Sequence, residues 1–401
     1  MKFDIFFAIC QTEVEGYMPD EATMFRQFFS QVKLADQLGY GVAWVAETHL
    51  SCEIQKQLPT AVIPHFKGEI GLNTDILQLA HQVFAVTKQI EVGSAIRNIL
   101  CNGGPIAHAE AVRTFLALHG LNANEKRRLH LGFASGRFDF SNRPYGIVWR
   151  NALEKQAWPV LKGKILQQAT EIFLRLLRGD LLSSQDISPL LLRAQDFRTA
   201  EDWQKVSSLA GGQTQIEVPT FWLFEKLGVI PREVRRDLLA LTIGTHDPEA
   251  QVKANQILPV GVFNLSITPP EVIEATHKRL QENYHPDGGP WRRDLMPRTV
   301  MVFIDQESQK AKARAQAAYE NYWRAMEGTL DSKKVEQAVG NALVGTPKEI
   351  IQQVRNRYQP EDRVMLWFDF NLHDNDLIEA SMRLFMQDVA PEFSATGQGA
   401  K

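Results

Sequence analysis

Three polar stretches follow buried apolar runs, and their residue types could carry acid–base chemistry or hold an anion. The first, Glu47-Thr48-His49, comes directly after the apolar run 42–46. An imidazole titrates near neutral pH and can give or take a proton. We therefore predict His49 and Glu47 as catalytic residues. The alternative is that the two side chains merely pair with each other or with the backbone.

The other two stretches could hold the phosphate of a ligand. Ser135-Gly136-Arg137 follows the apolar run 129–133, where small residues permit close approach and the arginine offers a fixed cationic fork. Thr245-His246 precedes a helix start at Pro248, and a helix N-terminus presents free N–H groups to a phosphate. The alternatives are an ordinary surface turn with a solvated Arg137, and simple capping of the helix by Thr245 or Asp247.

Small residues also predict a place for a flat ring. Ser94 and Ala95 end the apolar run 90–95, and their side chains leave room for a ring against the backbone. Tight core packing is the alternative. The glycines at 103–104 and 211–212 form neither a GxGxxG fingerprint nor a P-loop, so no nicotinamide or nucleoside-triphosphate site is predicted.

No metal site and no disulfide framework are predicted. Glu47 and His49 could join His65 around a metal, but a barrel metal site needs several ligands at strand ends and no convincing third or fourth is present. The three cysteines, Cys10, Cys52 and Cys101, are odd in number and contain no CxxC pair. A reducing cytoplasm is the compartment that fits this cysteine usage.

The elements that must position these residues alternate between short apolar runs and amphipathic helical stretches, which is typical of α/β proteins. The run 3–9 is nearly continuously apolar, as a strand buried on both faces should be. Eight such runs favour a closed sheet, so we predict an α/β fold: a single (β/α)₈ TIM barrel with insertions in the connecting loops. The predicted strands are 3–9, 42–46, 90–95, 129–133, 238–243, 260–265, 299–304 and 364–368.

Helices are predicted over 19–38, 76–86, 105–118, 151–177 and 376–389. Four connections are too long for simple loops: 51–74, 179–235, 283–297 and 327–343. Ligands bind at the C-terminal ends of barrel strands, so insertions after strands should shape the pocket. Those before strands should serve stability or assembly. Residues 1–393 are predicted to form the barrel and 394–401 a disordered tail.

Bulk composition excludes several classes of partner. The 401 residues are 44% hydrophobic and 23% charged, and 44 basic against 47 acidic side chains give a net charge of −3. There is no electrostatic case for nucleic acid or an anionic membrane. The apolar start is interrupted at Asp4 and lacks a cleavage site, so a buried strand is expected there and not a signal peptide. No stretch approaches the roughly 18 apolar residues of a membrane span.

Several of these segments resemble the luciferase-like flavin monooxygenases. The family's helix-one to strand-two stretch usually ends in Trp-x-x-Glu-His-His, and the corresponding stretch here is FFSQVKLADQLGYGVAWVAETHL. The family's C-terminal signature resembles LVGTPKEIIQQVRNRY followed by SMRLFMQDVAPEF. Between them, in the family's order, come IEVGSAI, PIAHAEAV and RLHLGFASGRF. The likeness covers most of the chain apart from the insertions; the C-terminal and strand-two matches are the specific ones.

The resemblance implies a (β/α)₈ barrel that binds reduced FMN, or in some branches the deazaflavin F420. The flavin ring would lie over Ser94 and Ala95, where the family often has a non-proline cis peptide. His49 would sit over the ring face where oxygen reacts. The phosphate would be held near two turns, by Ser135, Gly136, Arg137, Thr245 and His246.

The chain also departs from the family's pattern. Thr48 stands where the family commonly has the first histidine of its pair, the one usually assigned to catalysis. His49 would therefore carry a changed role, or the chemistry would differ from aldehyde oxidation. Ser135 replaces the usual arginine before the glycine of strand four, with Arg137 as a substitute. The usual Asp-x-x-Ser-x-Gly-Arg before that strand is degenerate here and reads HGLNANEKRR.

The leading prediction is a monooxygenase that uses reduced FMN and O₂, by way of a flavin C4a-hydroperoxide, to oxidise a small hydrophobic substrate in a dry pocket. A separate flavin reductase would supply the cofactor, and we expect a dimer because family members commonly dimerise. One alternative is an F420-dependent oxidoreductase that transfers a hydride. The other is a flavin-binding partner subunit without catalysis, which Thr48 supports and the retained Glu47 and His49 oppose.

Overall fold

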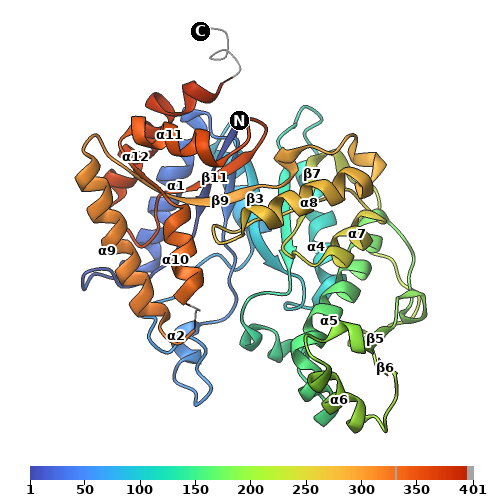
Figure 1. The fold of residues 1–401 in the computed structure, drawn as a ribbon. Coiled ribbons are helices and arrows are strands. Elements are labelled where there is room, and N and C mark those ends of the chain that lie inside the picture. Colours follow the sequence, from blue (N-terminus) through green and yellow to red (C-terminus); the bar gives the residue numbers. More distant parts are fainter. Residues whose placement is uncertain (330–331, 395–401) are drawn as a thin grey trace.

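The computed structural model describes residues 1–329 and 332–394 and is built on one curled sheet of nine parallel strands, with helices outside it (Figure 1). The strand order is β10-β9-β11-β1-β2-β3-β4-β7-β8. In chain order the strands are β1 (Lys2–Phe7), β2 (Val42–Val45), β3 (Glu91–Asn98), β4 (Leu129–Ala134), β7 (Leu239–Ile243), β8 (Val260–Val262), β9 (Arg298–Ile304), β10 (Leu343–Gly345) and β11 (Arg363–Trp367).

All eight strands predicted from apolar runs are present, with ends shifted by a few residues. All four residues of β2 are buried, and so are five of the six in β1. A parallel sheet covered by helices buries both faces of its strands, which is why these runs do not alternate with polar residues. β10 is an additional strand of three residues, too short to leave a signal in the sequence.

Helices follow most strands and cover the outside of the sheet (Figure 1). The first begins after Asp20, whose carboxylate accepts the Thr23 N–H at 2.7 Å, and it ends at Gly39 in the left-handed conformation. The helices are α1 (Glu21–Leu38), α2 (Cys52–Gln55), α3 (Ile76–Val86), α4 (Gly104–His119), α5 (Ala152–Arg178), α6 (Ala200–Leu209), α7 (Pro248–Asn255), α8 (Pro270–Asn283), α9 (Ser308–Met326), α10 (Ser332–Asn341), α11 (Pro347–Arg357) and α12 (Asn375–Asp388).

The sheet curls so far that the segment after β8, at one end of the strand order, lies next to the start of β9, near the other end. An isolated parallel bridge joins Asn264, just after β8, to Arg298 at the start of β9. The Asn264 N–H donates to the Pro297 carbonyl at 2.9 Å, and the Thr299 N–H donates to the Asn264 carbonyl at 3.0 Å. Further along β9, its neighbour is β10. The architecture is thus a strongly curled, TIM-barrel-like parallel sheet.

The connection 179–235 contains structure of its own. It forms an antiparallel pair, β5 (Leu190–Arg193) and β6 (Gln215–Val218), together with α6, and these lie beside α5 away from the main sheet (Figure 1). Leu190, Leu192 and Ile216 are buried between exposed neighbours, which is the alternation of a one-sided strand pair. This insertion precedes β7, and the role in stability or assembly expected of such an insertion stays a prediction.

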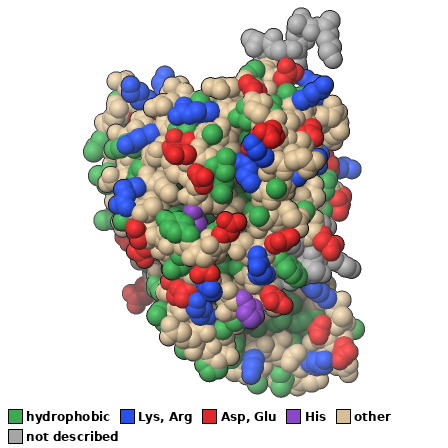
Figure 2. Space-filling view, turned by 90° about the vertical axis from the view of Figure 1, so that its left-hand side faces the viewer, with side chains coloured by type: hydrophobic (Ala, Val, Ile, Leu, Met, Phe, Trp, Pro, Cys, Tyr) green, Lys and Arg blue, Asp and Glu red, His purple; other side chains and the backbone are tan. Residues whose placement is uncertain are grey.

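The surface carries both signs of charge. Figure 2 shows acidic and basic side chains interspersed over the face that it presents. Among the residues described, no helix is long and apolar enough to cross a bilayer. The predicted tail 394–401 lies outside the described residues except for Ser394.

Candidate functional site

A cavity of about 440 Å³ opens where the parallel strands end, and its wall comes from the C-terminal ends of β1, β2, β3, β4, β7, β8 and β11. We call it the central cavity. Its volume is within the range of small-molecule sites, and its position is that of ligand sites in barrel enzymes. The long connection after β2 contributes to the wall, as predicted for insertions that follow strands. Most of the wall is apolar, and it includes seven aromatic side chains: Phe6, Phe66, Phe138, Phe140, Tyr322, Trp367 and Phe370.

Six of the nine predicted site residues line the central cavity. They are Glu47, His49, Ala95, Ser135, Gly136 and Arg137. Ser94 lies behind the wall, fully buried, and its Oγ has no hydrogen-bond partner among the described residues. The turn after β7 reaches the cavity at Gly244, but Thr245 and His246 are not part of the wall.

The turn that carries Thr245 and His246 leads into α7, and Asp247 caps that helix. The Thr245 hydroxyl accepts the Asp247 N–H at 3.2 Å, and Asp247 accepts the Glu249 N–H at 2.9 Å. The Nε2 of His246 lies 3.1 Å from Oδ1 of Asn264 and takes no part in the cap. The capping alternative is thus present for Asp247, and phosphate binding by Thr245 and His246 stays a prediction.

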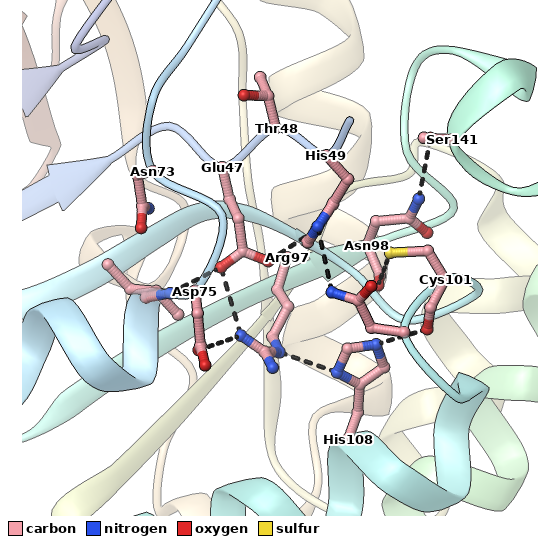
Figure 3. A network of polar contacts seen from close by, with 12 residues as sticks. Glu47, Thr48, His49, Asn73, Asp75, Arg97, Asn98, Cys101, His108 and Ser141 are labelled. Carbon is pink, nitrogen blue, oxygen red and sulfur yellow. Dashed lines mark hydrogen bonds and ion pairs between the residues drawn. The ribbon is translucent and has the colours of Figure 1, made fainter. Parts of the chain in front are cut away.

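His49 is held on both ring nitrogens (Figure 3). The Tyr145 hydroxyl donates to Oδ1 of Asn102 at 2.6 Å, which leaves the Asn102 amide to donate to Nδ1 of His49 at 3.1 Å. Nε2 of His49 then carries the proton and faces Oε1 of Glu47 at 3.2 Å. His49 is 7% exposed, and these two contacts fix the orientation of its ring at the cavity wall.

Glu47 links the end of β2 to the start of α3. Its Oε2 accepts the Ile76 N–H at 3.0 Å and lies 3.3 Å from Nη1 of Arg97. The same Arg97 nitrogen lies 3.0 Å from Oδ1 of Asp75, the N-cap of α3. Two carboxylates therefore share one buried guanidinium and the positive end of a helix dipole. The pairing that was the alternative for Glu47 is present in the structure, and its catalytic role stays a prediction.

His108 completes the network below Arg97 (Figure 3). Its Nδ1 accepts the Arg97 Nε–H at 2.9 Å, and its Nε2–H donates to the Cys101 carbonyl at 3.0 Å. Burial, and after it the positive charge of Arg97, lower the pKa of His108 to about 3. A neutral His108 can accept from Arg97, and this fixes the plane in which the guanidinium meets Glu47.

Small residues and one cation form the other side of the cavity. The Ala95–Ile96 peptide bond is cis, one bond beyond the position implied by the family resemblance. A Cβ on Gly244 would lie 2.5 Å from Cδ1 of Ile96, so a larger residue there would require the Ile96 side chain to shift. Arg137 is exposed, stacks its guanidinium at 5.2 Å over the Phe138 ring, and forms no ion pair within 1–329 and 332–394. The cavity thus has the small residues Ala95 and Gly244 in its wall, together with a cation that has no anionic partner among those residues.

Asp369 is a second acid in the cavity wall, two residues after β11. The residue lines the cavity, yet its Oδ1 is buried and has no hydrogen-bond partner in the described part of the chain. The same holds for the indole Nε1 of Trp367. Burial raises the pKa of Asp369 to about 7.

Sequence reasoning missed Arg97, Asn102, His108 and Asp369. Of these four, Asp369 could have been found from the sequence. It is a lone carboxylate that follows an apolar strand in the run WFDF, and the same pattern singled out Glu47. The others had none, because they meet His49 and Glu47 through the fold and not through spacing. In the described chain no cluster of three or more His, Cys, Asp or Glu could hold a metal ion.

Comparison of the sequence with family models gives no match, and comparison with curated proteins gives none either. Solved structures do match. Monooxygenase RslO1 from Streptomyces bottropensis is 16% identical with a TM-score of 0.68, covering 98% of this chain and 100% of that one.

Two further solved structures are similar over nearly the whole chain. The oxygenating constituent of 3,6-diketocamphane monooxygenase from Pseudomonas putida, in complex with FMN, is 14% identical with a TM-score of 0.61 and 98% coverage of both chains. An F420-dependent secondary alcohol dehydrogenase is 12% identical with a TM-score of 0.52, covering 97% of this chain and 99% of that one. The structural neighbours are luciferase-like monooxygenases and F420-dependent enzymes, and the chain shares their fold.

Proposed function

We propose that the central cavity binds reduced FMN and that the protein is a flavin-dependent monooxygenase acting on a small, apolar organic substrate. The observation that carries the proposal is the combination, in one cavity, of the small residue Ala95, an apolar wall and Arg137, which has no anionic partner among the described residues. One neighbour of the same fold is in complex with FMN, and several are monooxygenases.

The residues present fit such a cofactor. The ring would lie along the small residues Ala95 and Gly244, and the phosphate would meet Arg137 and the backbone of Ser135 and Gly136. Reduced flavin, when bound, supplies the electrons that activate oxygen, while the protein supplies position and dryness. The aromatic wall would keep water from the reacting atoms, and His49, held by Asn102 and Glu47, places a polar group at their edge.

An F420-dependent oxidoreductase is the second candidate. Two neighbours of the same fold use F420, although their TM-scores of 0.52 and 0.51 are below the 0.68 of RslO1. Such an enzyme would transfer a hydride without oxygen. Binding of F420 in preference to FMN, with no oxygen consumption, would select it.

The proposal includes features of the whole protein. Closure of the curled sheet into a complete (β/α)₈ barrel is supported by the two hydrogen bonds of Asn264 beside β9. A separate flavin reductase is included because no nicotinamide fingerprint is present in the sequence. A dimer is expected by analogy with the family that the sequence resembles. Co-purification with a reductase and the mass in solution test these two points.

The function is tested with ¹⁸O₂. The anaerobic protein is mixed with photoreduced FMN and a panel of aliphatic aldehydes and cyclic ketones, labelled oxygen is admitted, and products are read by mass spectrometry. A monooxygenase places one labelled atom in an organic product. Label found only in water and peroxide for every substrate, with flavin reoxidised at the rate of free FMN, would contradict the proposal.

A further inference from the structure

A reaction that reduces oxygen consumes protons, and His49 is poorly placed to supply them. Its Nδ1 accepts from Asn102 and its Nε2–H is directed at Glu47, so neither nitrogen is free to meet a ligand without breaking a contact. Glu47 is committed in turn to Arg97 and to the N-terminus of α3. The proton donor must therefore be sought elsewhere in the cavity wall.

Asp369 has the opposite properties. It lines the same cavity, and its Oδ1 has no hydrogen-bond partner in residues 1–329 and 332–394. Its immediate neighbours are the Ala8 amide, the Trp367 indole and the Cys10 thiol, none of them a cation. The other titratable or charged groups of the wall are Glu47 and His49 after β2, Arg137 after β4 and Tyr322 on α9.

Asp369 also lines a second, very small cavity. This cavity has a volume of about 10 Å³, and its lining combines the polar groups of Asp369, Cys10, Gln27 and Gln31 with six apolar side chains. That is close to the smallest space that holds one water molecule, and the polar groups offer hydrogen bonds to it. Gln27 is partly exposed at the surface. Asp369 therefore lines both the central cavity and a small cavity that reaches a partly exposed glutamine.

We propose that Asp369 is the proton donor of the central cavity and delivers a proton to the oxygen reduced there. The inference rests on the proposed function. Placing one atom of dioxygen in an organic substrate and releasing the other as water takes two electrons and two protons. Reduced flavin, bound as its anion, would supply the two electrons and one proton, and Asp369 supplies the second proton; without an organic substrate the same electrons and protons give hydrogen peroxide. The O–H bond of the carboxylic acid breaks, an O–H bond forms on the reduced oxygen, and the carboxylate regains its proton from solvent past Gln27.

The test needs no organic substrate. The full-length protein, in excess over photoreduced FMN, is mixed with oxygen and flavin reoxidation is followed from about pH 5 to about pH 9. Because burial raises the pKa of Asp369 to about 7, the wild-type rate should fall about tenfold as pH rises through that value. In Asp369→Asn the rate should be low and independent of pH, and Asp369→Glu should restore the slope. Asp376→Asn, an exposed position on α12, is the matched control.

A second readout needs no cofactor. A carboxyl whose pKa is higher in the folded than in the unfolded chain binds more protons when folded, so it lowers stability progressively as pH rises between the two values. Asp369→Asn should therefore melt at a higher temperature than wild type at pH about 8, and at nearly the same temperature near pH about 4. Asp376→Asn should follow wild type throughout.

The outcomes separate the two proposals. If Asp369→Asn binds FMN normally and keeps the wild-type rate and pH profile, Asp369 is not the proton donor. If its melting curve also tracks wild type at every pH, the residue does not titrate as a buried acid. If no variant, wild type included, binds FMN, the proposed function fails and the proton-donor role falls with it.

Discussion

Arg97 is the residue on which the polar network beside the cavity depends. It is 4% exposed and holds Glu47 and Asp75 through one nitrogen and His108 through another. Replacing it in Arg97→Met leaves a fully buried Glu47 without its counter-charge. We expect a loss of about 3–5 kcal/mol in the free energy of unfolding, measured by urea titration.

The matched control for that prediction is a surface pair. In Arg355→Met an arginine that is about half exposed loses its contact with Glu392, and the change should be below about 1 kcal/mol. Equal effects of the two substitutions would mean that the buried network does not hold the end of β2 in place.

At the scale of elements, the turn after β4 shapes the predicted phosphate site. Gly136 has φ of 72°, and a Cβ there would lie 2.4 Å from Nδ2 of Asn98, which is itself tied to Asn142 at 2.6 Å. Gly136→Ala should cost about 1–2 kcal/mol of stability and weaken FMN binding, because the turn must shift. Chemical denaturation and a fluorescence titration with FMN measure the two effects.

Gly163→Ala gives the contrast. Gly163 is exposed within α5 and a Cβ there meets nothing, so alanine should stabilise the protein by about 0.5–1 kcal/mol and leave FMN binding unchanged. A Gly136→Ala variant with wild-type stability and affinity would show that the turn is not part of the site.

The pairing of β3 with β4 has a pH-dependent component at the end of the sheet away from the cavity. Burial raises the pKa of Glu91, but His130 at 2.6 Å and Arg128 outweigh it and lower that pKa to about 2. A depressed carboxyl pKa gives stability that is full above the unfolded value and is lost as pH falls from about 4.5 towards 2.

Glu91→Gln should therefore be less stable than wild type at pH 7 by about 1–3 kcal/mol and should lose less on acidification. Urea titrations at several pH values measure both. Glu110→Gln, at an exposed position of α4, should reproduce the wild-type profile. If Glu91→Gln loses as much stability on acidification as wild type does, Glu91 is not the source of the pH dependence.

The elements were predictable to the extent that burial leaves a pattern in the sequence. The strands of the parallel sheet are continuous apolar runs, so eight were identified. β5 and β6 were not, because four-residue strands inside the polar connection 179–235 have too few buried positions to stand out.

Glu47 and His49 were found because they share one strand end. Arg97 reaches Glu47 from β3, Asn102 reaches His49 from the turn after it, and only the fold brings them there.

At the scale of the molecule, one feature accounts for the position of the site. The strands of the curled sheet run parallel, so their C-terminal ends meet on one side, and residues from seven of them converge on the central cavity. The insertion that carries β5 and β6 precedes its strand and contributes no residue to the wall of the central cavity. Cofactor, substrate and proton donor are therefore all assigned to the same end of the molecule.

The most direct test of this account compares reduced FMN with reduced riboflavin, which has the same ring and no phosphate, by equilibrium dialysis against wild type and Arg137→Met. We predict that FMN binds one per chain and at least about tenfold more tightly than riboflavin, and that Arg137→Met removes this difference while riboflavin still binds. If neither flavin binds, or if both bind equally and Arg137→Met changes nothing, the central cavity is not the flavin site proposed here.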